Sequence, residues 1–337
     1  MKFVITKYRI TGCWYGRRKA DTPVKADELL SVISGFCKWV SGVPHMSHTH
    51  IRSGTYPFEV YVKDCASDGH DFLVALWLSS HEKNTNIYAI NENDPPDGTQ
   101  GVEKKDFGAG KIPGFPAYFF IDADACLLYT VRPTHLQVNG RSQFDAALKF
   151  YMQNHAGAIQ KEKRVLDDGT VAIGLNMVGA DDEPLKPKFE STLQKMPSAT
   201  QELKRRVHEI RKIVHTQDIS RKAQDEKVSI VTSVFKIIGA DLEKFQSRDV
   251  SDSKRIKCEV DVRLELEEVE RLIQRQDEAR SNERFGFKFK GDSKTMWADA
   301  CIAKKELDIP IKASGDMPIS AKILLAALER DRAAVVK

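Results

Sequence analysis

Hydrophobic and polar residues alternate over several short stretches in the first half of the chain, which is the pattern of half-buried β-strands. Phe3–Ile10 and Phe58–Val62 are two such strands, whereas Phe72–Leu78 is apolar at every position and predicts a fully buried strand. Asp27–Val40 and Gln143–Gln153 carry apolar residues at helical spacing and predict helices. We therefore expect an α+β domain with a mixed or antiparallel sheet.

Two apolar runs, Tyr118–Ile121 and Leu127–Val131, are separated by a short segment that contains Asp122 and Asp124. Such a segment is typical of a hairpin turn, because aspartate side chains accept hydrogen bonds from the backbone of their own turn. Two nearby carboxylates are also ligands suited to Mg²⁺ in phosphoryl chemistry. A metal-dependent nuclease that uses Asp122 and Asp124 is therefore the alternative function, although further carboxylates at a recognisable spacing are missing.

The second half of the chain predicts another α+β domain, of helices and a small sheet. We place the boundary between Ala156 and Gln160, which gives domains over residues 1–157 and 158–337. Asn91–Lys111, rich in Asn, Asp, Pro and Gly, predicts an exposed loop in the first domain. The elements expected in the second domain are a strand pair around Val165–Val178, a polar linker over Gly179–Lys188, a strand over Cys258–Leu266, and helices over Ser198–Thr216, Val228–Ile238, Glu268–Ala279 and Pro318–Val335.

The predicted helix Ser198–Thr216 has an apolar and a basic side. Ser198 and Gln201 have the spacing of a capping box. A basic side opposite an apolar one is expected where a helix lies against phosphates. A solvated helix face has the same pattern, and Glu202 and Glu209 dilute the charge, so both interpretations stay open. The apolar side is Leu203, Val207, Ile210 and Val214, and the basic side is Lys204, His208, Arg211 and His215, flanked by Arg205 and Lys212.

Three phenylalanines alternate with glycine and lysine in the segment R-F-G-F-K-F-K-G-D-S-K, residues 284–294. In a strand, Phe285, Phe287 and Phe289 face one way, and Lys288 and Lys290 face the other. Three aromatic residues in such a row are usually buried. We expect a strand with inward phenylalanines, closed by a turn at residues 291–292, whose outward lysines meet either phosphate or water.

Composition alone identifies no partner. The 337 residues are 41% hydrophobic and 30% charged, with a net charge of +4, so the position of the charges matters more than their sum. The first 25 residues carry seven Lys or Arg against the single acid Asp21. Together with the basic segments above, this gives the candidate DNA-binding residues Lys204, Arg205, His208, Arg211, Lys212, Lys288, Lys290, Arg17, Arg18 and Lys19.

Several other classes of protein are disfavoured. The six cysteines lack C-x-x-C spacing, which disfavours structural zinc and predicts free thiols in a reducing cytoplasm. No apolar run has the length of a signal-peptide core or of a membrane span, so direct membrane insertion is not expected. His45, His48 and His50 are expected to be loop histidines, with a metal site as the less favoured interpretation. Phosphate-loop and nucleophile-elbow motifs are absent, and no cofactor is expected.

Five segments share their pattern and order with a known family: G-F-P-A-Y-F-F-I-D-A-D at 114–124, L-Y-T-V-R-P at 128–133, V-F-K-I-I-G-A-D-L-E at 234–243, D-V-R-L-E-L-E-E-V at 261–269 and F-K-F-K-G-D-S at 287–293. In these segments the chain resembles the RexA family of phage exclusion proteins, which belongs to the Rex system of phage lambda. The similarity is one of pattern and order over most of the chain. The chain departs from the family in a longer first half and in acidic residues at Glu265, Glu267, Glu268 and Glu270, so DNA contacts near Arg263 are not carried over.

The resemblance implies a cytoplasmic, non-enzymatic homodimer that binds duplex DNA with little sequence preference. It further implies that the protein senses phage DNA or protein–DNA complexes and signals to a membrane-channel partner, which leads to abortive infection. Under this hypothesis the second domain carries both DNA binding and dimerisation.

Overall fold

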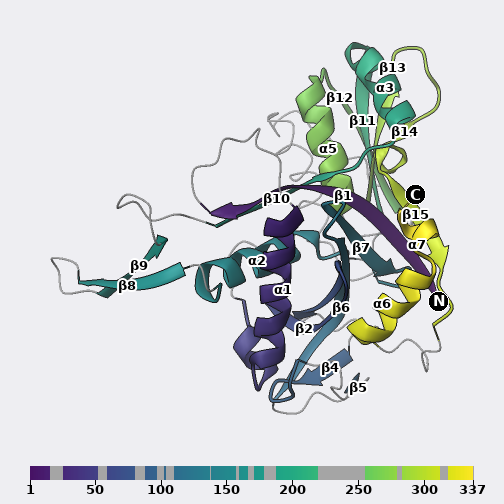
Figure 1. Cartoon of the computed structure of the whole chain (residues 1–337). Coiled ribbons are helices and arrows are strands. Elements are labelled where there is room, and N and C mark those ends of the chain that lie inside the picture. Colours follow the sequence, from purple (N-terminus) through teal and green to yellow (C-terminus); the bar gives the residue numbers. More distant parts are fainter. Residues whose placement is uncertain are drawn as a thin grey trace. The chain divides into compact units, whose positions relative to one another are not determined.

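The structure is a computed structural model with an α+β fold, as predicted (Figure 1). The chain divides into two compact units: unit 1 comprises Met1–Thr192 with Lys304–Lys337, and unit 2 comprises Leu193–Ala303. None of the described helices is long and apolar enough to cross a membrane. The described residues are 1–15, 26–51, 59–79, 88–96, 102–103, 110–136, 138–156, 159–165, 171–177, 187–218, 255–278, 283–311 and 318–336.

Unit 1 is built on a large sheet whose central path has the order β10-β1-β7-β6-β3-β2. Strands β4 and β15 join this path at β6 and β1, and β5 pairs with β4. The strands are β1 (Lys2–Tyr15), β2 (Glu59–Asp68), β3 (Asp71–Ser79), β4 (Tyr88–Asn91), β5 (Val102–Glu103), β6 (Lys111–Asp122), β7 (Leu127–Pro133), β10 (Pro187–Leu193) and β15 (Lys304–Asp308). A separate antiparallel hairpin is formed by β8 (Ile159–Val165) and β9 (Val171–Met177).

Helices cover both faces of this sheet (Figure 1). On one face Phe120 and Tyr129 share a core with Leu324 and Leu328 of the C-terminal helix. On the other face the ring of Phe119 stacks on Phe144 at 4.6 Å between ring centroids. Every residue of β3 is buried as a result, which confirms the strand predicted from its continuous apolar run. The helical elements are α1 (Ala26–Gly42), the 3₁₀ turn η1 (Met46–Thr49), α2 (Arg141–Asn154), α6 (Ala321–Arg330) and α7 (Arg332–Val336).

Two buried hydrogen bonds fix the start of α6 on the sheet. The hydroxyl of Tyr118 accepts from the backbone N–H of Ile319 at 2.7 Å, and the carboxylate of Asp64 accepts from Ala321 N–H at 2.7 Å. The first N–H groups of a helix have no partner within the helix, so these side chains satisfy donors that would otherwise be buried alone. Burial also raises the pKa of Tyr118 above its ordinary value.

The division into units differs from the predicted boundary near residue 157. Strand β10 pairs with β1, which keeps residues up to Thr192 in unit 1. After unit 2 the chain returns, because β15 pairs antiparallel with β1 and places Lys305 opposite Ile5. Pairing between strands some 300 residues apart leaves no local signal in the sequence.

Unit 2 contains an antiparallel sheet of order β12-β11-β13-β14, with α5 packed against β13. Phe285, Phe287 and Phe289 are buried, which confirms the predicted inward face of β13. Gly291 has φ of +84° and Asp292 N–H donates to the carbonyl of Phe289, which confirms the turn. The elements are α3 (Pro197–Arg206), η2 (Val207–Glu209), β11 (Ile210–Asp218), β12 (Arg255–Asp261), α5 (Leu266–Glu278), β13 (Glu283–Phe289), β14 (Met296–Trp297) and η4 (Ala298–Cys301).

The predicted helix Ser198–Thr216 is wrong over its second half. The helix α3 ends at Arg206, and after the 3₁₀ turn η2 the chain becomes the strand β11. β11 pairs with β12 on one side and β13 on the other, and this pairing outweighs the helical periodicity of its residues. The capping box is also wrong: Met196 is the N-cap, and Pro197 opens the helix without a side-chain cap bond.

The remaining element predictions agree with the structure with three exceptions. The strand predicted over Cys258–Leu266 ends at Asp261, and Leu266 is already the first residue of α5. The closing helix is interrupted at Asp331, so α6 and α7 replace one continuous helix. The segment Asn91–Lys111 contains the two-residue strand β5. Val228–Ile238 and most of Gly179–Lys188 lie outside the described residues.

Gly140 is the N-cap of α2, and its backbone requires glycine. Its φ is +72°, and an added Cβ would lie 2.7 Å from Cβ of Ala117. We expect Gly140→Ala to lower the free energy of unfolding by about 1–3 kcal/mol, through backbone strain and this clash. Gly69→Ala is the matched control, because Gly69 has φ of +57° but open space around it. Urea denaturation of both variants measures the difference, and an equal loss in both would contradict the clash.

Candidate functional site

Five of the candidate DNA-binding residues lie along one continuous path in unit 2. Lys204 and Arg205 are in the last turn of α3, His208 is in η2, Arg211 is the second residue of β11, and Lys290 follows β13. The backbone N–H of Lys290 donates to the carbonyl of Glu209 at 2.8 Å, which joins the two ends of the path. We call these five residues, Lys204, Arg205, His208, Arg211 and Lys290, the basic end of unit 2.

Arg206 forms ion pairs with the acidic residues of this region. It was not among the residues predicted from the sequence. Its guanidinium pairs with Glu209 at 2.8 Å, with Asp292 at 2.9 Å and with Glu202 at 3.7 Å. It also lies 4.3 Å from the centroid of the Phe289 ring, a cation–π contact that holds the guanidinium over the sheet. The acids that dilute the basic charge in the sequence therefore all have Arg206 as a partner.

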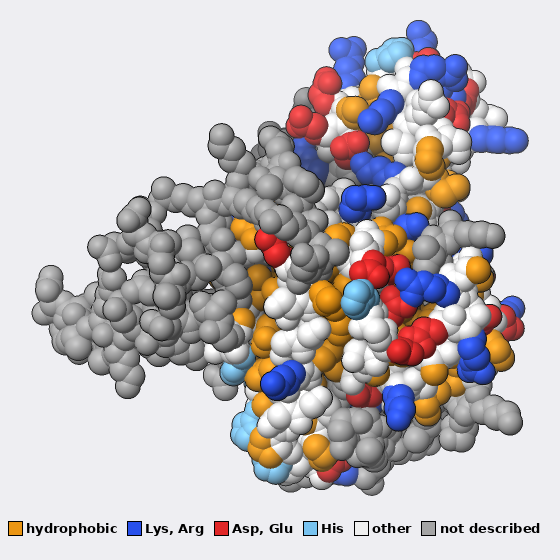
Figure 2. All heavy atoms as spheres, viewed as in Figure 1, with side chains coloured by type: hydrophobic (Ala, Val, Ile, Leu, Met, Phe, Trp, Pro, Cys, Tyr) orange, Lys and Arg blue, Asp and Glu red, His pale blue; other side chains and the backbone are white. Residues whose placement is uncertain are grey.

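The cations of the basic end are turned towards solvent. Lys204, Arg205, Arg211 and Lys290 are exposed, and none of them forms an ion pair within the part of the chain that the structure describes. The side chain of His208 is 74% exposed. Figure 2 shows Lys and Arg side chains gathered over the region of α3 and β13. An exposed group of long cationic side chains with few competing acids can bind an extended anion such as a phosphate backbone.

Lys212 and Lys288 lie on the outward face of the sheet, as predicted for Lys288, but they have a protein partner. The carboxylate of Glu259 on β12 lies 2.7 Å from Lys257, 2.7 Å from Lys288 and 3.9 Å from Lys212. Hydrogen bonds from Lys257 and Lys288 lower the pKa of Glu259 to about 2. We call Lys212, Lys257 and Lys288 the lysine cluster; one internal carboxylate balances part of its charge.

The basic side predicted for a long helix is therefore split between several elements. His215, its last member, is buried in β11, where its ring stacks on Phe285 at 4.6 Å between centroids. This position follows from strand geometry, which turns His215 and Ile213 to the same face as the phenylalanines. Arg17, Arg18 and Lys19 lie outside the described residues.

The histidines of the first half are engaged in ordinary contacts. Nδ1 of His45 lies 2.7 Å from the carbonyl of Asn93, and the ring of His50 stacks on Tyr61 at 4.5 Å. Among the described residues, no group of three or more His, Cys, Asp or Glu is arranged to hold a metal ion.

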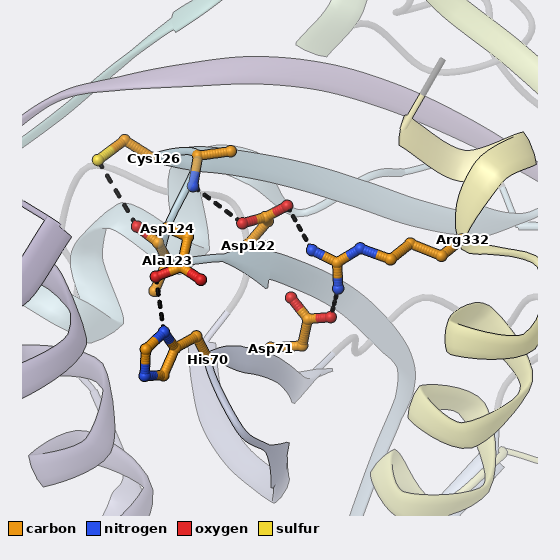
Figure 3. A network of polar contacts seen from close by, with 8 residues as sticks. His70, Asp71, Asp122, Ala123, Asp124, Cys126 and Arg332 are labelled. Atoms are coloured by element: carbon orange, nitrogen blue, oxygen red, sulfur yellow. Dashed lines mark hydrogen bonds and ion pairs between the residues drawn. The ribbon is translucent and has the colours of Figure 1, made fainter.

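Asp122 forms part of a buried charge network at one end of the sheet in unit 1 (Figure 3). It lies opposite Asp71 in the β3–β6 pair, and the guanidinium of Arg332 from α7 contacts both carboxylates. The Nη2–Oδ2 distance to Asp122 is 2.7 Å. The other oxygen of Asp122 accepts from Ala125 N–H at 2.9 Å, which confirms the predicted aspartate turn.

Asp124 does not converge with Asp122. Its carboxylate turns to His70, with 2.6 Å between Oδ1 and Nδ1, and both side chains are more than half exposed (Figure 3). The two carboxylates of the predicted metal pair thus have separate partners, Arg332 for one and His70 for the other. The nuclease alternative stays an untested prediction, and the contacts of Asp122 indicate a structural role.

No protein-family model, no curated protein and no solved structure matches the chain.

Proposed function

We propose that unit 2 binds duplex DNA through the phosphate backbone, with little dependence on sequence. The basic end contacts the phosphates, and Lys212 and Lys288 extend this contact along the sheet. The observation that supports the proposal is the pairing of Glu202, Glu209 and Asp292 with Arg206, which leaves four neighbouring exposed cations without an acidic partner among the described residues. Lys and Arg that contact phosphates fix position on DNA but carry no direct sequence information.

The proposal is tested by gel shift with two duplexes of equal length and unrelated sequence. We expect both to bind with affinities that agree within about threefold, because phosphate contacts are common to all sequences. Absence of binding to either duplex at low salt would overturn the proposal. A strong preference for one sequence would contradict its sequence independence.

A wider role in phage exclusion is proposed from the RexA-like resemblance alone. In this role the chain acts as a cytoplasmic homodimer that detects phage DNA and signals to a membrane-channel partner. Expression of the chain with its neighbouring reading frames in a bacterial host, followed by phage challenge, tests it. Unchanged phage yield in the presence of the full locus would contradict the role without affecting DNA binding by unit 2.

Glu259→Gln is expected to tighten duplex binding several-fold. The change removes the internal counter-charge of the lysine cluster, so more positive charge is available to phosphates. It should also remove a pH-dependent contribution to stability. Because the folded pKa of Glu259 is lowered from 4.5 to about 2, that contribution is present above pH 4.5 and is lost as the pH falls towards 2.

Fluorescence anisotropy with a labelled duplex, and thermal melting between acidic and neutral pH, measure the two effects of Glu259→Gln. Asp261→Asn is the matched control, because Asp261 is 84% exposed and, among the described residues, forms an ion pair only with Lys212, at 3.8 Å. The control should change affinity by less than about twofold, since exposed ion pairs contribute little. Unchanged or weaker binding of the Glu259 variant would contradict a phosphate-binding role for the lysine cluster.

A further inference from the structure

Trp297 and Arg284 contact each other on the outward face of the unit 2 sheet. The indole of Trp297 packs over Gly286, where an added Cβ would come within 2.9 Å of the indole ring. The guanidinium of Arg284 lies 4.4 Å from the centroid of the Trp297 ring. Asp299 accepts two hydrogen bonds from Nη2 of Arg284, at 3.1 and 3.3 Å. The Trp297 ring therefore contacts the guanidinium, and Asp299 fixes it through hydrogen bonds to Nη2. We call Trp297 and Arg284 the stacking layer.

The stacking layer shares its sheet face with the lysine cluster. Strand register places Arg284 and Lys288 on one side of β13, opposite Thr216 and Lys212 of β11, with Lys257 next in line on β12. The centre of this face is closed, since Val214 is buried beside Gly286, but the side chain of Arg284 is 43% exposed and that of Lys257 is 51% exposed. The face thus combines a partly exposed planar group with cations beside it.

We propose that this face binds a segment of single-stranded nucleic acid, which deepens the proposed function and rests on it. An unpaired base stacks on the open side of the Arg284 guanidinium, and neighbouring phosphates contact Lys288, Lys212 and Lys257. Guanidinium planes and aromatic rings are surfaces on which unstacked bases pack, and such stacking does not depend on sequence. A base within a duplex has both faces covered by its neighbours, so only an unpaired strand can use the stacking layer.

The charges on this face also favour a single strand over a duplex. Glu259 and Asp299 offset part of the positive charge of the lysine cluster and Arg284. A duplex, whose binding derives mainly from phosphate neutralisation, gains less from such a balanced face than from the basic end. A single strand gains affinity from each stacked base and needs fewer cations. The basic end and the lysine cluster therefore contact the phosphates of either form, whereas the stacking layer serves a single strand alone.

The experiment compares two labelled probes by fluorescence anisotropy: oligothymidine of about 20 nucleotides and a duplex of the same length. Arg284→Lys keeps the positive charge but loses the planar group. We expect it to weaken oligothymidine binding by about tenfold and duplex binding by less than about twofold. Trp297→Phe keeps a ring beneath the guanidinium, and its oligothymidine affinity should lie between those of wild type and Arg284→Lys.

Arg275→Lys is the matched control, because Arg275 lies over the ring of Phe285 on the opposite face of the same sheet, at 5.7 Å. It should leave both affinities within about twofold of wild type. Duplex binding without oligothymidine binding, or an equal loss of both affinities in Arg284→Lys, would overturn the inference and leave the proposed function standing. Binding to neither probe would overturn both. A merely structural role for Arg284 predicts a lower melting temperature with an unchanged ratio of the two affinities.

Discussion

Replacing Arg332 by alanine is expected to lower the free energy of unfolding by about 2–4 kcal/mol. Arg332 is the cation that contacts both Asp71 and Asp122, whose side chains are 8% and 5% exposed. Without it, two carboxylates face each other at the end of β3 and β6 with little water around them. This decrease in the free energy of unfolding is smaller than the decrease expected for a fully buried ion pair, because the side chain of Arg332 is itself 43% exposed.

Urea denaturation measures this effect, with Arg330→Ala as the control. Arg330 is the preceding basic residue, is exposed, and donates only to the carbonyl of Ala326 in its own helix among the described contacts. Arg330→Ala should lower the free energy of unfolding by less than about 0.5 kcal/mol. Adding Asp71→Asn to Arg332→Ala should restore part of the lost free energy of unfolding, because it removes one of the two carboxylate charges that no longer have a cation beside them. An equal cost for Arg330→Ala and Arg332→Ala would contradict the role of the charge network.

Removing the four exposed cations of the basic end is expected to weaken duplex binding at least about tenfold. In the variant with Lys204, Arg205, Arg211 and Lys290 all changed to alanine, up to four phosphate contacts are lost, and each contributes about 0.9 to the slope of log affinity against log salt. The loss should be the same for unrelated sequences, since the contacts are to the backbone. Fluorescence anisotropy against labelled duplexes gives both quantities.

The control removes the same number of charges from unit 1. Lys2, Lys38, Lys149 and Lys322 are exposed residues of β1, α1, α2 and α6, and changing all four to alanine gives the same net charge. Circular dichroism should show an unchanged fold for both variants. If the unit 1 variant lost as much affinity as the unit 2 variant, binding would depend on net charge rather than on the basic end.

The sequence predicts elements well where one local pattern allows a single structure. The apolar run of β3 and the alternating phenylalanines of β13 both reach a low free energy only when their side chains are buried. The turn around Asp122 is similarly local, because its Oδ1 bonds the N–H of Ala125 three residues later. These features were predictable because the interactions that form them lie close together in the chain.

The features that could not be predicted from the sequence depend on contacts between residues that are far apart in the chain. Residues 207–216 fit a helix by apolar spacing and a strand by their β-branched residues, and only pairing with β12 and β13 selects the strand. Arg332 and Asp122 are 210 residues apart, so their contact has no local signature. For the candidate site, the basic residues were visible in the sequence. The pairing of Arg206 with three acids could not be predicted from the sequence, because Asp292 belongs to a turn that is distant in the chain.

The slope of duplex affinity against salt tests phosphate binding by the basic end most directly. Binding constants for wild type and for the Lys204, Arg205, Arg211 and Lys290 variant are measured with one duplex from low to moderate salt. We predict a steep negative slope for wild type and a slope reduced by about 3–4 for the variant. Equal slopes for the two proteins, or a wild-type affinity that does not change with salt, would contradict phosphate binding by the basic end.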